Sequence, residues 1–418
     1  MSEVIHFPLN QNSLNLKKAN TDISPPGISK SDIPNSPKPN ISLPQRRTYR
    51  TPSFKKNPIA AIYQDIFENQ RNFGKKIADM FMNLSLLNVL AVAPTQSGKT
   101  GSMVGVIYEF LQNPTLRLPK SNIFVFTGHS SLEWLEQTKA RFPEWLHPHI
   151  YHRNHLRKII SDMKGRKNVL IIIDECHVAS KPHQTIDRLF DECSYKAQNF
   201  MYENNIKLVQ FTATPENLDE KFTEQMKDSH AMAHMDVPDQ YLSIEKLEEQ
   251  GRLFAVKDIC GEIPIPGTND SKSVVNSGIL ENIHEIGTHV EGMEPSYHII
   301  RTPRGAGHEK VIANFKKTFS DKNYRYLSEP AMKDEKMDTL LETKPELHTF
   351  IFIKDKLRCA KTIHHEFIGI LYDRIVKIPN HSSTIQGLLG RLTGYHKNTK
   401  AIVFTCPFEI EHDLKERE

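Results

Sequence analysis

Short apolar runs alternate along most of this chain with longer stretches in which apolar residues recur at helical spacing. Asn88–Val92 and Val169–Ile173 are such runs. Runs of this length are typical of strands buried on both faces, and helices between them imply right-handed crossovers in a parallel sheet. The rhythm loosens after about residue 216 and resumes near residue 297. The pattern therefore predicts the α/β fold class, with two parallel-sheet domains in tandem.

The individual elements follow from the same pattern. We expect strands at residues 88–92, 122–126, 169–173 and 207–211 in the first domain, and at 297–301, 324–327, 348–353, 367–372 and 401–404 in the second. Helical spacing is present at residues 59–83, 100–112, 131–140 and 310–319. We predict four segments: a disordered basic tail at 1–57, a first domain at 58–220, a connector or insert at 221–292 and a second domain at 293–418.

Length and composition limit the number of domains and the class of protein to which the chain can belong. A length of 418 residues allows two or three domains with cores of their own. The longest apolar runs are too short to span a bilayer, and the first ten residues lack the pattern of a secretory signal. The five cysteines have no CxxC spacing, which argues against a zinc site and for a reducing compartment. We therefore expect a soluble, intracellular protein.

Charge is unevenly placed along the chain. The net charge is +4, but residues 1–57 carry nine Lys and Arg against three Asp and Glu, so the rest of the chain is slightly acidic. A basic, proline-rich tail can hold phosphate backbones without sequence preference, or can simply remain a solvated leader.

The segment from Ala93 to Thr100 (APTQSGKT) follows a predicted strand and opens a predicted helix. Backbone N–H groups and a helix N-terminus converge on phosphates in this setting. Lys99 is then expected to reach the β- and γ-phosphates of ATP, and the Thr100 hydroxyl to hold Mg²⁺. The usual first glycine of such a loop is Ala93 here. The remaining cradle residues that we predict are Thr95, Gln96, Ser97 and Gly98.

Two carboxylates stand at the end of the strand predicted at 169–173. A buried Asp174 requires a cation, which makes it a second candidate ligand for Mg²⁺. Glu175 can orient and deprotonate the water that attacks the γ-phosphate, and His177 can sense that phosphate. A similar triplet at 191–193 lies in polar, helical surroundings, and we interpret it as a solvated face.

Thr212 and Thr214 lie at the end of the next strand, within FTATP, and can couple the nucleotide site to the domain interface. APTQSGKT, DECH and TATP, in this order, resemble motifs I, II and III of superfamily 2 DExH-box helicases and translocases. The resemblance implies two RecA-like domains with ATP bound between them. It also implies that Thr127 and Gly128 contact a nucleic-acid backbone and that Gln70 reads the adenine.

The second domain resembles the family less closely. Residues 386–395 (QGLLGRLTGY) are similar to motif VI, which makes Gln386 a site residue and Arg391 the arginine finger. One extra residue precedes Gly390, and Gly394 stands where the family has a second arginine. Residues 350–362 occupy the place of motif V, where Lys354, Arg358 and Lys361 either grip a phosphate backbone or form a solvated basic face.

His147, His149, His152 and His155 have metal-like spacing without an accompanying carboxylate set, and alternating His147 and His149 also fit a strand. The sequence as a whole predicts a nucleic-acid-dependent ATPase that uses ATP and Mg²⁺, most simply a helicase of low sequence specificity. A double-strand translocase and a helicase-like scaffold without turnover are the alternatives. The Asn-, Lys- and Ile-rich composition resembles that of helicases from large DNA viruses.

Overall fold

The computed structural model describes residues 59–406, with gaps at 129, 131, 177, 179–182, 216–228, 262–277, 329–336, 355–362, 376–384 and 396–397. The predicted tail at 1–57 lies outside the described residues. No helix within these ranges has both the length and the apolar character needed to cross a membrane.

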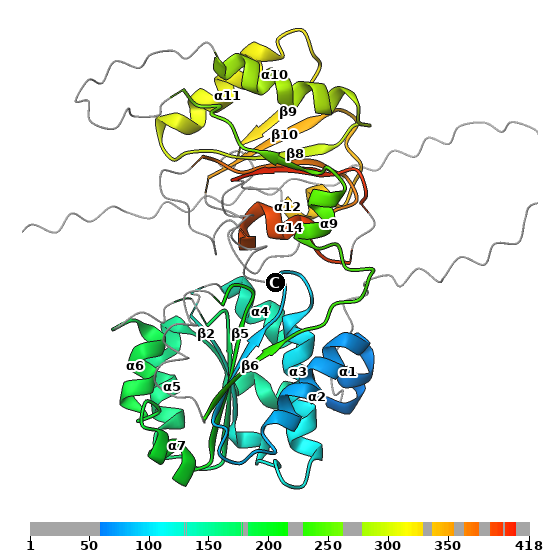
Figure 1. Cartoon of the computed structure of the whole chain (residues 1–418). Coiled ribbons are helices and arrows are strands. Elements are labelled where there is room, and N and C mark those ends of the chain that lie inside the picture. Colours follow the sequence, from blue (N-terminus) through cyan, green and yellow to red (C-terminus); the bar gives the residue numbers. More distant parts are fainter. Residues whose placement is uncertain are drawn as a thin grey trace, which may run out of the picture. The chain divides into compact units, whose positions relative to one another are not determined.

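The first sheet has six parallel strands in the order β3-β2-β4-β5-β1-β6 (Figure 1). Its strands are β1 (Asn88–Val92), β2 (Ile123–Thr127), β3 (Ile150–His152), β4 (Val169–Asp174), β5 (Ile206–Thr212) and β6 (His230–His234). All parallel strands of a sheet end at the same edge, so the loops that follow β1, β4 and β5 meet there. These are the loops that carry the first three sequence motifs.

Helices cover both faces of the first sheet. They are α1 (Ile59–Asp65), α2 (Glu68–Met80), α3 (Lys99–Gln112), α4 (Leu132–Arg141), α5 (Leu156–Met163), α6 (Thr185–Glu192) and α7 (Gln198–Glu203), with 3₁₀ turns η1 (Lys120–Asn122), η2 (Glu144–His149) and η3 (Arg153–His155). Figure 1 shows α1, α2 and α3 on the face opposite α5, α6 and α7. Helices α2 and α3 cross closely at Gly74, where a Cβ atom would lie 2.6 Å from the backbone of Gly105.

The second sheet also has six parallel strands, in the order β7-β12-β11-β8-β10-β9. They are β7 (Leu253–Ala255), β8 (Tyr297–Arg301), β9 (Arg325–Ser328), β10 (Thr349–Ile353), β11 (Ile368–Tyr372) and β12 (Ile402–Thr405). Its helical segments are α9 (Ile244–Glu249), α10 (Gly278–Glu291), α11 (Ala306–Thr318), α12 (Met337–Leu341), the π-helical turn η5 (Ile385–Leu389) and α14 (Gly390–Leu392). Figure 1 shows α10 and α11 on one face of this sheet and α9, α12 and α14 on the other.

Two parallel sheets with helices on their faces confirm the predicted α/β fold class. The described part of the segment from 221 to 292, for which the sequence predicts a connector, contributes a strand to each sheet. β6 pairs with β1 in the first sheet, and β7 pairs with β12 in the second. The predicted domain limits themselves stay predictions.

The interpretation of His147 and His149 as strand residues is wrong. Both lie in the 3₁₀ turn η2, which contains Pro148, and the strand begins only at Ile150. Pro148 cannot donate to a strand ladder, and the ring Nε2 of His147 bonds the carbonyl oxygen of Phe142.

Candidate nucleotide site

The loop between β1 and α3 has the backbone of a phosphate cradle. Gln96 and Gly98 have left-handed φ values of 62° and 101°. Such residues turn successive N–H groups toward one side, which makes an anion-binding concavity. The backbone N–H and the hydroxyl of Ser97 both donate to the carbonyl oxygen of Pro94, at 3.1 and 2.7 Å. The loop is therefore a closed turn that delivers Lys99 to the first position of α3.

Lys99 and Glu175 form an ion pair at the shared edge of the first sheet. The Nζ atom of Lys99 lies 2.9 Å from Oε1 of Glu175, and their side chains are only 13% and 4% exposed. Burial opposes the charge of Lys99, but the charges of Glu175 and Asp174 outweigh burial and raise its pKa. Glu175 has a φ of 51°, a conformation that non-glycine residues adopt only where the surroundings enforce it. The first predicted cation and the predicted catalytic carboxylate are thus in contact.

Asp174 is buried with one oxygen held and the other open. Its Oδ2 accepts a hydrogen bond of 2.8 Å from the indole N–H of Trp134, whereas Oδ1 has no hydrogen-bond partner among the described residues. Burial and the charge of Glu175 raise the pKa of Asp174, although Lys99 opposes the shift. A buried carboxylate with an open oxygen suits a hard divalent cation, so Asp174 fits the predicted Mg²⁺.

Thr100, the other predicted Mg²⁺ ligand, accepts a hydrogen bond of 3.3 Å from Nη1 of Arg141. Arg141 and Trp134 both belong to α4, so this one helix contacts both predicted metal ligands. The sequence did not indicate either contact, because nothing in the spacing of α4 relates it to the loops after β1 and β4.

Gln70, on α2, lies against the phosphate loop. Its Nε2 donates to the carbonyl oxygen of Ser97 at 3.3 Å, and its Oε1 accepts from the N–H of Phe67 at 3.2 Å. A Cβ atom at Gly98 or Gly101 would overlap the Gln70 amide, at 1.8 and 2.0 Å. The Gln70 amide therefore packs directly against both glycines, and its adenine-reading role stays a prediction.

Arg391, from α14 beside the second sheet, is also close to the phosphate loop. Its side chain is buried, and its charge opposes the rise in the pKa of Lys99. The ring Nε2 of His365 donates to the carbonyl oxygen of Arg391 and so fixes its backbone. The structure brings Arg391 within electrostatic range of Lys99, and its role as arginine finger stays a prediction.

A buried ion pair supports the segment that leads to Arg391. Nη1 of Arg301, at the end of β8, lies 2.9 Å from both carboxylate oxygens of Asp373, just after β11. A Cβ atom at Gly387 would lie 3.1 Å from the same guanidinium. The π-helical turn η5 therefore passes directly over the pair, and a Cβ atom at Gly387 would require the guanidinium to shift slightly.

The carbonyl oxygen of Thr95 has two partners that the sequence did not indicate. The hydroxyl of Tyr241 donates to it at 2.5 Å, and the hydroxyl of Thr393 donates to it at 3.0 Å. The next aromatic residue, Tyr395, accepts a hydrogen bond from Asn69 at 2.8 Å. No local pattern in the sequence identifies these contacts, since the partners are 146 and 298 positions from Thr95.

The remaining predicted residues lie as follows. Thr212 and Thr214 are fully buried, and the Thr212 hydroxyl bonds both backbone groups of Thr214 in a closed turn. Thr127 is buried beside Asp174 in the sheet register, and a Cβ atom at Gly128 would overlap the Val178 carbonyl. Coupling and nucleic-acid contact by these residues stay predictions.

The structure does not test some of the predicted site residues. Lys354 ends up directly after β10 and is partly exposed. His177, Arg358 and Lys361 lie outside the described residues, and for Gln386 only the backbone, within η5, is described.

Three of the four histidines with metal-like spacing make aromatic contacts. The rings of His152 and His155 stack with centroids 4.1 Å apart, and His149 packs against Phe124 at 4.9 Å. Among the described residues, no three His, Cys, Asp or Glu side chains group in a way that could hold a metal ion.

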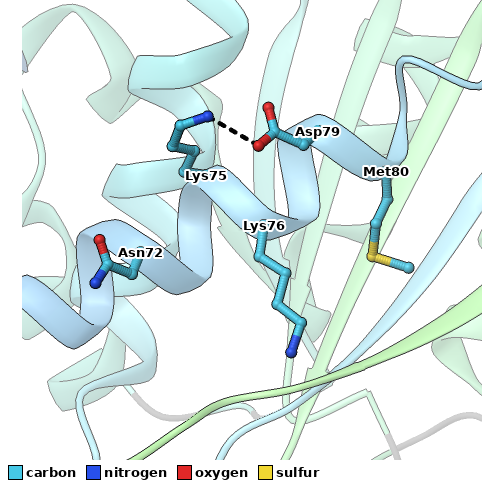
Figure 2. Close-up of a pocket in the computed structure, with 5 residues that line it drawn as sticks. All are labelled: Asn72, Lys75, Lys76, Asp79 and Met80. Carbon is cyan, nitrogen blue, oxygen red and sulfur yellow. Dashed lines mark hydrogen bonds and ion pairs between the residues drawn. The ribbon is translucent and has the colours of Figure 1, made fainter.

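A surface hollow of about 570 Å³ lies along the outer face of α2 and is lined by Asn72, Lys75, Lys76, Asp79 and Met80. Figure 2 shows Lys75 pointing at Asp79, with which it forms an exposed ion pair of 2.9 Å, while Lys76 points away. An exposed ion pair of this kind contributes little to the stability of the fold. None of the predicted site residues lines the hollow. The candidate site is therefore the edge of the first sheet.

No known protein-family model matches the chain. An uncharacterized protein of Acanthamoeba polyphaga mimivirus is 28% identical over 355 residues, which cover 77% of this chain and 80% of that protein. Among solved structures, S. cerevisiae Dbp5 bound to RNA and ADP BeF3 aligns over 87% of this chain and 91% of its own, with a TM-score of 0.45 and 13% identity. The Escherichia coli DEAH/RHA helicase HrpB aligns over 85% of this chain and 44% of its own, with the same TM-score and identity. We therefore infer the function from the residues of the site itself.

Proposed function

We propose that the chain is a nucleic-acid-dependent ATP hydrolase, and more narrowly an ATP-dependent helicase. The observation that carries the proposal is the buried pair of Lys99 and Glu175 at the end of a phosphate cradle. A buried lysine beside helix N–H groups recognises a triphosphate, and a carboxylate next to it can serve as base for an attacking water.

The ion pair between Lys99 and Glu175 explains how ATP binding would prepare the site for catalysis. Phosphate oxygens that enter the cradle compete with Glu175 for the ammonium of Lys99, because both are anions within reach of one cation. Once released, Glu175 can accept the proton of the water that attacks the γ-phosphate. Arg391 then stabilises negative charge on the transferring phosphoryl group from the opposite side.

Magnesium supplies charge neutralisation on the phosphate oxygens when it is bound. Asp174, through its open Oδ1, and Thr100, through its hydroxyl, would hold the ion. Trp134 orients the carboxylate, and Arg141 donates to the Thr100 hydroxyl, whose second lone pair stays available to the ion.

The nucleic-acid partner is supported by the resemblance of the three motifs and by Lys354 at the end of β10. We expect contacts mainly to phosphates, so binding should weaken with salt and depend little on sequence. A scaffold that keeps the fold without turnover is the second candidate, because Gly394 replaces the family's second arginine.

The test is ATP hydrolysis measured alone and with single- or double-stranded DNA or RNA, with Glu175→Gln as the inactive reference. Stimulation by one of these polymers is the expected result. Hydrolysis without stimulation would contradict the nucleic-acid dependence, and no hydrolysis at all would favour the scaffold. Strand displacement compared with triplex displacement then separates a helicase from a duplex translocase.

A further inference from the structure

Two hydroxyl groups from distant parts of the chain converge on one backbone oxygen of the phosphate loop. Tyr241 lies between β6 and α9, and Thr393 follows α14. Both donate to the carbonyl oxygen of Thr95, at 2.5 and 3.0 Å. Tyr241 and Thr393 are only 2% and 1% exposed. Because water has little access to these groups, the two hydrogen bonds hold the carbonyl in one direction.

The direction of this carbonyl fixes a donor on its other side. The peptide that joins Thr95 to Gln96 is planar, and no peptide bond in the described chain is cis. Its N–H group, which belongs to Gln96, therefore points away from the two hydroxyls. Gln96 has a φ of 62° and starts the left-handed turn of the phosphate cradle. A rotation of this peptide would turn the Gln96 N–H group away from the direction that the two hydroxyls impose on it.

Two glycines let the donors come this close. A Cβ atom at Gly390 would lie 2.7 Å from Cγ2 of Thr95, and one at Gly394 would lie 3.0 Å from Cβ of Gln96. The backbone of Gly394 also pairs with Leu242, next to Tyr241, through bonds of 2.9 and 3.0 Å. Tyr241 and Thr393 are thus held on one short bridge, so they act on Thr95 as a unit.

We propose that Tyr241 and Thr393 are positioning residues that orient the Gln96 N–H toward bound phosphate through the Thr95 carbonyl. The proposal rests on the proposed ATP site. It adds that affinity for the phosphates is set by residues outside the first sheet and its helices. Any movement that separates Gly394 from the phosphate loop then weakens the binding of phosphate.

The test is the affinity of the full chain for a fluorescent ADP analogue, compared with adenosine, in Tyr241→Phe, Thr393→Val and the double variant. Each single change removes one donor with little change of shape, and we expect about threefold weaker binding of the ADP analogue; the double variant should bind about tenfold more weakly. Affinity for adenosine should not change, because it has no phosphate for the Gln96 N–H to bind.

Tyr395→Phe is the matched control. It removes a neighbouring hydroxyl that bonds Asn69 and does not touch Thr95, so the ADP analogue should bind as in the wild type. Thermal melting of each variant shows whether the fold is retained, and the single variants keep the test valid if the double variant unfolds.

Two failures are distinguishable. A folded double variant that binds the ADP analogue as tightly as the wild type overturns the role of Tyr241 and Thr393, provided that Lys99→Ala abolishes binding. A wild-type chain that does not bind the analogue at all overturns the proposed ATP site instead.

Discussion

Trp134 donates its indole N–H to Oδ2 of Asp174 across 2.8 Å, although the two residues lie 40 positions apart in the chain. The bond leaves Oδ1 as the open oxygen and points it in a fixed direction. Partners that orient a metal-binding carboxylate in this way commonly matter almost as much as the carboxylate itself.

Replacing Trp134 with phenylalanine should therefore impair magnesium use. We expect Trp134→Phe to raise the magnesium concentration needed for half-maximal ATP hydrolysis about tenfold or more, since Asp174 loses its orienting donor. A magnesium titration of the hydrolysis rate measures this. Trp145→Phe is the control, because the other tryptophan of the chain contacts Lys120 instead. Equal magnesium dependence in both variants would argue against the role of Trp134.

Replacing Glu175 with glutamine should separate binding from turnover. Glu175→Gln removes the anion that competes with phosphate for Lys99, so ATP should bind at least as tightly as in the wild type. Hydrolysis should fall about 100-fold or more, because the general base is lost. Equilibrium binding and steady-state hydrolysis measure the two effects. Glu192→Gln, at the exposed last position of α6, should change neither. Weaker ATP binding by Glu175→Gln would contradict the competition.

Introducing an arginine at position 394 should impair the candidate site. Gly394 has a φ of 118°, and its missing Cβ would press on Gln96. We expect Gly394→Arg to lower the free energy of unfolding by about 1–3 kcal/mol and to lower ATP hydrolysis as well. Gly251→Arg is the control, since Gly251 has a φ of 63° in open space. It should cost stability without a loss of hydrolysis. Faster hydrolysis by Gly394→Arg at unchanged melting temperature would count against this reading.

Acid should destabilise the second sheet through His298. Burial, and to a smaller extent the charge of His348, lower the pKa of His298 to about 3. In the unfolded chain His298 becomes protonated near pH 6.5, whereas in the folded chain it becomes protonated only near pH 3. Stability is therefore complete above pH 6.5, and its loss as the pH falls is about 1.4 kcal/mol per pH unit until the folded pKa is reached.

His298→Phe removes this titration and keeps a ring beside Phe350. Denaturant unfolding from pH 7 to pH 4 should show a shallower loss of stability in this variant than in the wild type. Equal slopes for His298→Phe and the wild type would exclude His298 as the cause.

The sequence predicted the elements that the core itself specifies. β1 and β8 have the predicted limits, because each is a five-residue segment that is buried along all or nearly all of its length. The strands that sequence reasoning missed are β3, β6 and β7, which all lie at sheet edges. An edge strand needs no continuous apolar run. The residues of β6, for example, are mostly half-buried and begin and end with histidine.

The candidate site likewise has a part that the sequence predicted and a part that it did not. The order of the loops after β1 and β4 was sufficient to place Lys99 next to Glu175, because parallel strands end at one edge. Trp134, Tyr241 and Thr393 could not be found from the sequence. Each reaches the site through packing between segments far apart in the chain, and a single hydroxyl or indole has no spacing that marks its partner.

The position of β6 has a mechanical consequence. β6 pairs with β1 along its whole length, and the ladder continues beyond it, since the N–H of Met235 donates to the carbonyl oxygen of Val92 at 2.9 Å. The chain leaves the first sheet from this strand and reaches Tyr241 seven residues after His234. A pulling force on that exit would shear the ladder against the strand that ends in the phosphate loop. The hydrogen bonds between β6 and β1 are therefore one route by which such a force would reach the phosphate loop.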